Sequence, residues 1–565
     1  MSEFLSPKVN DEDFRLGRFR VVAVWLGIAV LAAFLVGRLL WIQVLHPERL
    51  IAASDARVVR NYYYEPPRGL ITDRQGRILA ISVPVKSVDA DPKLLHESGV
   101  ATDPKRIARL ASILEQDPQD LEEKISDPGK RFVHLKRYLE LKDAKTLKSL
   151  GGDGIILHDS YRRFYPTGTV NSTLVGILNG EGEGVYGVEQ SFNSYLSSTE
   201  TKQKARKDRY DRVVENLEVL QQGNAGGNLM LSVDDRLQSA AFQSLREAVL
   251  ENKAQSGTLV MIDVLSGEIL AMVSYPAFDP NERSHFDSDH AQNRAVSDIF
   301  EPGSTLKPIV SLSALENRVA TWNKVFDTRP FSVDGKMVRD SHFMETGTLK
   351  DIIKYSSNTA MAHMAMKLGP HKVLEMLRRF GFGERSQSGL VGESPGRLNE
   401  QRPFWADIDV ATLGFGYGVA VTTLQLAQAY ATLANGGRRV PVSALKVSKP
   451  GEALQAADAK DVRRMQQALE TVVTEGTGTQ AAIGRYRVAG KTGTAKIAGR
   501  GGYDNRYIST FAGFAPLSQP RFALVVAIKD PRGEKYYGGA VSGPVFRDVM
   551  SRALQLYNVA PDKKM

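Results

Sequence analysis

The chain contains no cysteine among its 565 residues. This absence excludes disulfide bonds, thiolate nucleophiles and cysteine-based zinc sites, so the stability of the fold depends on packing. Charged residues make up 24% of the chain and hydrophobic residues 42%, a balance typical of packed proteins rather than of disordered chains. One hydrophobic core rarely organises a chain of this length, and the sequence therefore predicts two or more domains.

Patterns that recognise nucleic acid are also missing, although the net charge is +9. The densest basic cluster lies at 202–212, where Asp208 and Asp211 interrupt it. Neither stacking aromatic residues nor a zinc-finger spacing accompanies this cluster. An interrupted cluster of this kind is typical of a solvated hairpin. We therefore expect no nucleic-acid partner.

Apolar runs of membrane length are confined to the N-terminal part of the chain. Residues 21–37 are uncharged and apolar, and residues 39–45 extend them if Arg38 reaches the membrane interface. A cleavable signal peptide is the alternative, but bulky residues follow where a small-residue cleavage site is expected. The pattern favours one uncleaved membrane-spanning helix.

Basic residues immediately before this run predict its orientation. Arg15, Arg18 and Arg20 favour a cytoplasmic N-terminus. The sequence thus predicts a cytoplasmic tail at 1–20, a transmembrane anchor at 21–45, and the rest of the chain outside the cytoplasm.

A polar, glycine-rich stretch at 221–228 (QQGNAGGN) marks the clearest boundary in the rest of the chain. Before it, short strands and charged helices predict a mixed α/β pedestal domain at 46–227. After it, a second domain is predicted at 228–565. Its expected strands lie at 229–233, at 257–273 as two strands joined at Ser266-Gly267, and at 486–489, 507–515 and 522–528. Its expected helices include 235–250 and 424–433. Strands at both ends with helices between them predict an α+β fold whose sheet joins the two ends of the domain.

Three short motifs occur in order in the second domain. They are Ser304-Thr305-Leu306-Lys307, Ser356-Ser357-Asn358 and Lys491-Thr492-Gly493-Thr494. The order S-x-x-K, S-x-N, K-T-G is the signature of serine enzymes that recognise penicillin. A second S-x-x-K at 443–446 has a valine-rich flank that favours a strand or loop. Before Ser304, in contrast, Pro302 and Gly303 allow a helix to begin at the serine.

The first motif provides a nucleophile and a base. A serine hydroxyl reacts well only when a base takes its proton, and on a helix Lys307 lies over the same face as Ser304. A free lysine is protonated at neutral pH, so this base must be desolvated or must face another cation, and Lys491 could supply that charge. A helix N-terminus at Ser304 would also favour developing negative charge.

The other two motifs provide polar groups for substrate. The Ser356 hydroxyl can pass a proton between Lys307 and a leaving amine, and the Asn358 amide suits a peptide backbone. Lys491 and the hydroxyls of Thr492 and Thr494 suit a substrate carboxylate, and Gly493 leaves room for a ligand along a strand. Each motif taken alone is also compatible with a helix cap or a tight turn.

With these motifs, the second domain resembles the transpeptidase domain of class B penicillin-binding proteins. The likeness extends to 257–272 (GTLVMIDVLSGEILAM), 300–308 (FEPGSTLKP), 489–495 (AGKTGTA) and 511–516 (FAGFAP), and to pedestal motifs at 68–80, 163–166 and 184–189. Glu301 and the sequence Ser-Ser-Asn at 356–358 favour the division-specific, septal type over the elongation type.

The resemblance implies a peptidoglycan D,D-transpeptidase of the inner membrane with a periplasmic catalytic domain. Ser304 would attack the D-Ala-D-Ala bond of a stem peptide, β-lactams would mimic that donor, and the backbone N–H groups of Ser304 and Thr494 would form the oxyanion hole. It also implies no metal or organic cofactor, a membrane glycan polymerase as partner, and contacts with other division proteins.

Three other classes compete with this interpretation. A β-lactamase or D,D-carboxypeptidase shares the nucleophile, but the nearest candidate for a deacylating glutamate, Glu393, has unsuitable spacing. A non-catalytic sensor would keep Ser304 and transfer nothing. The stretch at 182–187 matches G-x-G-x-x-G, but Glu181, Glu183 and Glu189 around it are unfavourable to a pyrophosphate.

Overall fold

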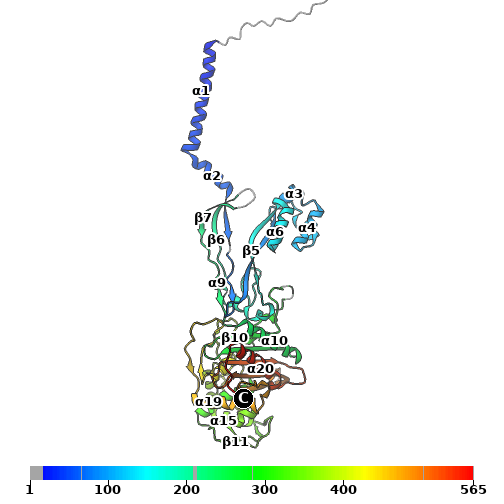
Figure 1. Ribbon diagram of the computed structural model, residues 1–565, viewed down its shortest axis with the longest axis vertical. Coiled ribbons are helices and arrows are strands. Elements are labelled where there is room, and N and C mark those ends of the chain that lie inside the picture. The colour runs from blue at the N-terminus through cyan, green and yellow to red at the C-terminus, as the bar shows by residue number, and fades with distance from the viewer. Residues whose placement is uncertain are drawn as a thin grey trace, which may run out of the picture. The chain divides into compact units, whose positions relative to one another are not determined.

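A computed structural model describes residues 17–64, 66–207, 213–282, 284, 286–499 and 502–563 (Figure 1). The chain forms two compact units. The first consists of Met1–Pro66 with Thr199–Asn224, and the second of Pro67–Ser198 with Ala225–Met565. Most of the expected cytoplasmic tail, residues 1–16, lies outside the described residues.

The first described element of the first unit is a long apolar helix. Helix α1 (Arg18–Leu40) continues into the π-helical turn η1 (Trp41–Leu45), and its side chains are almost all exposed. Arg18–Leu45 is the one helix among the described residues that is long and apolar enough to cross a membrane, with a mean hydropathy of 2.4. It contains the segment for which the sequence predicts an anchor. Helix α2 (Pro47–Val58) follows.

The rest of this unit is a three-stranded antiparallel sheet. Its order is β1-β6-β7, with β1 at Val59–Tyr64, β6 at Thr201–Lys207 and β7 at Val213–Gln221. The basic cluster thus begins on β6 of a hairpin, as expected. Residues 208–212, which include the remainder of the cluster, lie outside the described residues.

The N-terminal part of the second unit is a small α/β layer. Its sheet has the order β4-β3-β2-β8, and β5 pairs with β3. The strands are β2 (Ile71–Thr72), β3 (Ile78–Ala90), β4 (Val133–Leu139), β5 (Ile155–Phe164) and β8 (Leu229–Met230). The helices are α3 (Pro92–Glu97), α4 (Pro104–Leu114), α5 (Pro118–Ile125), α6 (Leu141–Gly151), α7 (Ser172–Val175), α8 (Gly187–Ser191) and α9 (Asn193–Leu196), with short 3₁₀ turns η2 (Gly152–Gly154) and η3 (Gly168–Val170).

Local sequence explains where three of these helices start. Each begins with an Asp-Pro pair, in which the aspartate carboxylate accepts hydrogen bonds from amides of the first turn. Proline at the first helical position loses no hydrogen bond there, because that N–H has no partner within a helix. The pairs are Asp91-Pro92, Asp103-Pro104 and Asp117-Pro118.

The larger part of the second unit is built on a five-stranded antiparallel sheet. Its order is β10-β9-β19-β18-β17. The bounds are β9 (Ser256–Asp263), β10 (Ile269–Tyr275), β17 (Ala489–Gly499), β18 (Gly502–Ala515) and β19 (Phe522–Lys529). Strands from early and late in the domain therefore share one sheet, which confirms the predicted α+β fold. The first expected strand, at 229–233, is only Leu229–Met230, and it pairs with β2 in the other sheet.

Helices cover both faces of this sheet because its strands are apolar on both sides. On β19, Val525 and its alternate neighbours pack toward α18 (Thr423–Ala434), whereas Val526 and its alternate neighbours pack toward α10 (Asp235–Glu251) and α20 (Gly538–Leu556). Alternate side chains of a strand point to opposite faces, so an unbroken apolar strand needs two covering layers. Figure 1 shows α10 and α20 beside β10.

Shorter elements connect these layers. The helices are α11 (Ser288–Ala291), α12 (Arg294–Ser297), α13 (Lys307–Glu316), α14 (Leu349–Tyr355), α15 (Asn358–Leu368), α16 (Pro370–Arg379), α17 (Asp407–Leu413) and α19 (Ala459–Thr474), with 3₁₀ turns η5 (Gly303–Leu306) and η6 (Thr479–Ala481). The small hairpin strands are β11 (Val325–Asp327), β12 (Phe331–Val333), β13 (Lys336–Val338), β14 (Thr346–Thr348), β15 (Arg438–Arg439) and β16 (Leu454–Gln455).

Candidate active site

Ser304 lies in a 3₁₀ turn that leads into helix α13. The expected α-helix beginning at the serine is therefore corrected, because the turn covers Gly303–Leu306 and the α-helix begins at Lys307. In a 3₁₀ turn the side chains at positions i and i+3 eclipse one another, so Lys307 still lies on the same side as Ser304. Gly303 has a φ of +55°, a backbone conformation that glycine adopts without strain.

The second motif forms the junction between two helices. Helix α14 ends at Tyr355, and the next residue, Ser356, turns the chain with a left-handed φ of +61°. Ser357 then caps helix α15 by accepting a hydrogen bond from the Ala360 amide at 3.2 Å. The left-handed turn brings the side chains of Ser356 and Asn358 to the same lysine. The helix cap that the sequence left open as an alternative is thus present, and the motif carries both features at once.

Lys307 and Lys491 meet at the Ser356 hydroxyl. Lys307 Nζ lies 3.1 Å from Ser356 Oγ, and Lys491 Nζ lies 2.9 Å from the same oxygen. Lys307 Nζ also donates to the Ser356 carbonyl at 2.5 Å and to Asn358 Oδ1 at 2.7 Å. Both lysine side chains are completely buried. The two amines are therefore neighbours, as the interpretation from the sequence requires.

Burial of this pair changes its protonation. Desolvation first, and then the adjacent Lys491 charge, lower the pKa of Lys307 well below its ordinary value, while Asp340 raises it. Desolvation lowers the pKa of Lys491 to about 7. Two buried ammonium groups on one hydroxyl repel each other, so the pair favours losing a proton. A neutral Lys307 keeps two N–H donors for its carbonyl and amide partners and has a lone pair free to accept a proton.

The K-T-G motif lies within strand β17, which begins at Ala489. The prediction that a strand at 486–489 precedes the motif is therefore wrong, because residues 486–488 lie outside any strand. Gly493 also has a second reason to be glycine. A Cβ there would lie 3.0 Å from the Pro302 carbonyl oxygen and 2.9 Å from Thr305 Cγ2, so the strand packs directly on the nucleophile turn.

A cavity of about 440 Å³ adjoins the residues of the three motifs. Five of the expected site residues line it, namely Ser304, Ser356, Asn358, Thr492 and Thr494. Aromatic residues form its walls, with His342 stacked on Tyr355 at 4.4 Å and Phe415 edge-on to Tyr417 at 5.9 Å. Phe415 and Tyr417 both line this cavity.

One expected contact is not made in the structure. Among the described residues, no hydrogen bond joins Ser304 Oγ to Lys307 Nζ. Hydrogen bonds between a nucleophile and its base are often long in free enzymes and shorten when substrate binds. A hydrogen bond stabilises the Ser304 turn, because the buried Tyr430 hydroxyl donates to the Thr305 carbonyl at 2.9 Å.

Asp340 is a site residue that the motifs did not indicate. Its carboxylate accepts hydrogen bonds from the Asn358 amide at 2.5 Å and the Thr359 amide at 2.9 Å. It therefore caps the helix that carries Asn358, and its charge opposes the lowering of the pKa of Lys307. No local pattern identifies Asp340, because it precedes Asn358 by 18 residues. The motifs do not indicate Thr477 either, because it precedes Thr492 by 15 residues, yet its hydroxyl lies 2.7 Å from that of Thr492.

We expect Asp340→Ala to impair both stability and reaction with penicillin. Loss of a capping carboxylate costs about 1–2 kcal/mol of unfolding free energy. Because the same carboxylate orients Asn358, acylation should also slow, by about tenfold or more for an equivalent loss at the transition state. Asp103→Ala is the matched control, since Asp103 caps α4 far along the chain from the site. The control should lose similar stability in denaturant titration and acylate at the wild-type rate; equal acylation by both variants would contradict the role of Asp340.

We expect Lys491 to make the fold more stable at high pH than at neutral pH. Its pKa is about 7 in the folded chain and ordinarily 10.5, so between these values the unfolded chain binds more protons. The free energy of unfolding then rises with pH across this window, by up to about 1.4 kcal/mol per pH unit. Lys491→Met removes the part of this slope that Lys491 contributes, whereas Lys307, whose pKa is also lowered, keeps its own part. Chemical denaturation at several pH values measures the slope, and an unchanged slope in Lys491→Met would show that the lysine is not buried as a neutral amine.

The second S-x-x-K motif and Glu393, which favoured competing interpretations, do not line the Ser304 cavity. In the second S-x-x-K, Ser443 forms a β-bridge with Glu268, and Lys446 Nζ donates to the Arg74 carbonyl at 3.0 Å. Glu393 accepts hydrogen bonds from the amides of Gln387 and Ser388, both at 2.8 Å, and is absent from the lining of the Ser304 cavity.

Comparison with known proteins assigns the chain to a family. Residues 63–231 match the penicillin-binding protein dimerisation domain, and residues 257–551 match the penicillin-binding protein transpeptidase domain. The peptidoglycan D,D-transpeptidase FtsI of Escherichia coli (strain K12) is 41% identical over 559 residues, which cover 98% of this chain and 95% of that protein. The probable peptidoglycan D,D-transpeptidase PenA of Neisseria gonorrhoeae is 34% identical over 97% of this chain and 94% of that protein.

Solved structures agree with this assignment. A peptidoglycan synthetase from Bifidobacterium adolescentis superposes with a TM-score of 0.71 at 25% identity, covering 90% of this chain and 98% of that one. Penicillin binding protein 3 from Mycobacterium tuberculosis, complexed with aztreonam, shares the fold with a TM-score of 0.67 at 23% identity over 89% of this chain and 98% of that one. The chain belongs to the class B penicillin-binding proteins, with a transpeptidase domain that follows a dimerisation domain.

Proposed function

We propose that the chain is a septal peptidoglycan D,D-transpeptidase that is inactivated by β-lactams at Ser304. The observation that carries this proposal is the pair of buried lysines on the Ser356 hydroxyl, in a cavity that also contains Ser304. The septal role is supported by relatives named FtsI. The catalytic residues of the proposal are Ser304, Lys307, Ser356, Asn358 and Lys491, and the substrate-binding residues are Thr492, Gly493 and Thr494.

In the proposed acylation step, Ser304 Oγ attacks the carbonyl carbon of the penultimate D-Ala of a stem peptide. The serine proton passes to neutral Lys307, and the oxyanion accepts hydrogen bonds from the backbone N–H groups of Ser304 and Thr494. The C–N bond then breaks. The departing D-Ala nitrogen takes a proton through the Ser356 hydroxyl, which both lysines contact.

The second step reverses this proton path. An amine of a neighbouring stem peptide attacks the acyl-Ser304 ester, gives up a proton to Lys307, and forms the peptide cross-link as Ser304 Oγ leaves and is reprotonated. The hydroxyls of Thr492 and Thr494 hold the substrate carboxylate, and the buried Lys491 supplies positive charge behind them. The aromatic walls restrict the access of water to the ester, which favours transfer to an amine over hydrolysis.

The remaining parts of the proposal concern location and partners. The chain spans the inner membrane once through Arg18–Leu45, with its N-terminus cytoplasmic and its catalytic domain periplasmic. A pedestal at 46–227 and a transpeptidase domain at 228–565 make up the periplasmic part. A membrane glycan polymerase supplies the strands that are cross-linked, and other division proteins contact the pedestal.

Mass spectrometry after incubation with penicillin tests the nucleophile. We expect a covalent adduct on the tryptic peptide that contains Ser304, and none in Ser304→Ala. Ser443→Ala is the matched control because Ser443 begins the second S-x-x-K, and this variant should acylate at the wild-type rate. An adduct that persists in Ser304→Ala would overturn the assignment.

Two measurements separate the proposal from its competitors. Turnover of the penicillin adduct within seconds would indicate a β-lactamase, whereas a transpeptidase should hold the adduct far longer. The position of Glu393, outside the cavity lining, argues against the deacylating role that a lactamase needs. Cross-linked product from donor and acceptor peptides excludes both a carboxypeptidase, which would release only hydrolysed donor, and a sensor, which would release nothing.

A further inference from the structure

A second cavity lies on the central sheet and shares no lining residue with the Ser304 cavity. Its volume is about 260 Å³, and its walls come from strands β9, β18 and β19, from Arg294 of α12, from Thr423 of α18 and from the segment Asp298–Phe300 between them. An engineered apolar cavity of about 150 Å³ in another protein is large enough to hold benzene. A small organic molecule therefore fits in this space.

The polar side of the cavity carries unused hydrogen-bond donors. The side-chain amine of Lys529 makes no hydrogen bond and no ion pair with any described residue, although the residue is half-buried. Arg294 forms an ion pair with Asp298 at 3.1 Å, yet its buried Nε atom has no partner. Two cations and one carboxylate line the cavity, so its walls carry a net positive charge. A half-buried cation without a partner is costly, and an anion in the cavity would remove that cost.

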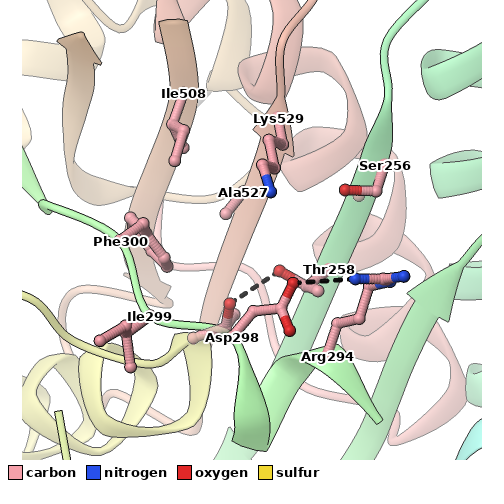
Figure 2. A pocket seen from close by; sticks show the side chains of 11 residues that line it. Ser256, Thr258, Arg294, Asp298, Ile299, Phe300, Ile508, Ala527 and Lys529 are labelled. Carbon is pink, nitrogen blue, oxygen red and sulfur yellow. Dashed lines mark hydrogen bonds and ion pairs between the residues drawn. The ribbon is translucent and has the colours of Figure 1, made fainter. Parts of the chain in front are cut away.

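The other side of the cavity is apolar. Ile508, Ala527 and Phe300 line it, and Figure 2 shows the Lys529 amine between Ile508 on one side and Ser256 on the other. The hydroxyls of Thr258 and Thr423 are already paired at 2.7 Å, so the polar groups without a partner among the described residues are the Lys529 amine, the Ser256 hydroxyl and Arg294 Nε. A ligand must therefore present one anionic end and one apolar body.

We propose that this cavity is a binding site for a small carboxylate with a compact apolar group. The carboxylate pairs with Lys529 and accepts a hydrogen bond from Ser256, and the apolar group packs against Ile508, Ala527 and Phe300. The site is close to the nucleophile along the chain. Phe300 and Val421 exchange backbone hydrogen bonds of 3.0 and 2.9 Å, and Phe300 precedes Ser304 by four residues.

Binding of benzoate to the full-length chain in lipid nanodiscs tests the proposal, with ligand-observed NMR as the measurement and empty nanodiscs as the background. Benzamide has the same shape without the charge, and we expect it to bind at least tenfold more weakly. Lys529→Met should weaken benzoate binding by tenfold or more. Lys449→Met, which removes an exposed lysine elsewhere, should leave it unchanged.

A second variant tests the position of the ligand independently of its charge. Ala527→Leu places a larger side chain in the cavity and should abolish benzoate binding, while labelling of Ser304 by fluorescent penicillin confirms that the protein is folded. The proposal is overturned if benzamide binds as tightly as benzoate. It is also overturned if either Lys529→Met or Ala527→Leu binds benzoate like the wild type.

Discussion

Replacing Lys307 by methionine should slow acylation of Ser304 by penicillin by about 10²- to 10⁴-fold, which is the usual contribution of a positioned general base. The methionine nearly preserves the volume of the side chain but has no lone pair that can accept the serine proton. Stopped-flow measurement of the second-order acylation rate constant gives this effect directly.

The same variant should lose no stability, and this separates a catalytic role from a structural one. Lys307 is completely buried beside a second cation, so exchanging it for an apolar side chain removes a desolvation cost and a repulsion. These gains offset the loss of its hydrogen bonds to the Ser356 carbonyl and Asn358 Oδ1. We expect an equal or higher melting temperature. Lys367→Met makes the same exchange at an exposed lysine of α15. This control should behave as wild type in both measurements. Acylation of Lys307→Met at more than a tenth of the wild-type rate would rule out this lysine as the base.

The pH dependence of acylation should show a second large effect. The base acts in its neutral form, and the neutral fraction falls tenfold for each pH unit below the pKa. Burial and the Lys491 charge lower the pKa of Lys307 well below its ordinary 10.5. The rate constant should therefore rise with pH in the acid range and become constant well before pH 10.5, and it should fall by about tenfold per unit on the acid side.

Lys491→Met tests the cause of this profile. Removing the neighbouring charge should raise the pKa of Lys307, because that charge is the second largest cause of its lowering. The inflection of the pH–rate profile should therefore move to higher pH, whatever happens to the maximal rate. A profile whose inflection stays in place would mean that the two lysines do not interact in the working enzyme.

Much of the chemistry was predictable from the sequence because it lies in short segments. Ser304 and Lys307 are one turn apart, and Lys491–Thr494 are consecutive, so their types and spacing identify them without a structure. The strands of the sheet were equally predictable, since unbroken apolar strands such as β19 appear as continuous apolar runs in the sequence. The 3₁₀ form of the Ser304 turn was not predictable, because short 3₁₀ turns are frequent at the N-termini of α-helices and both turns place residues three positions apart on one side.

Long-range pairing could not be predicted in the same way. Asp340 caps α15 from a separate loop, and the cavity around Lys529 joins residues from 256 to 529. Neither leaves a local pattern in the chain, since each depends on which segments the fold brings together.

The sequence by itself determined the residue types of the catalytic apparatus, the membrane-length apolar run and the α+β class. Each of these depends on patterns among residues that are close together in the sequence. Only the tertiary structure decided that two lysines from α13 and β17 share one hydroxyl on the turn between α14 and α15. That meeting removes both amines from water and places like charges together, so the lowered pKa of Lys307 is a property of packing that no segment of the chain possesses alone.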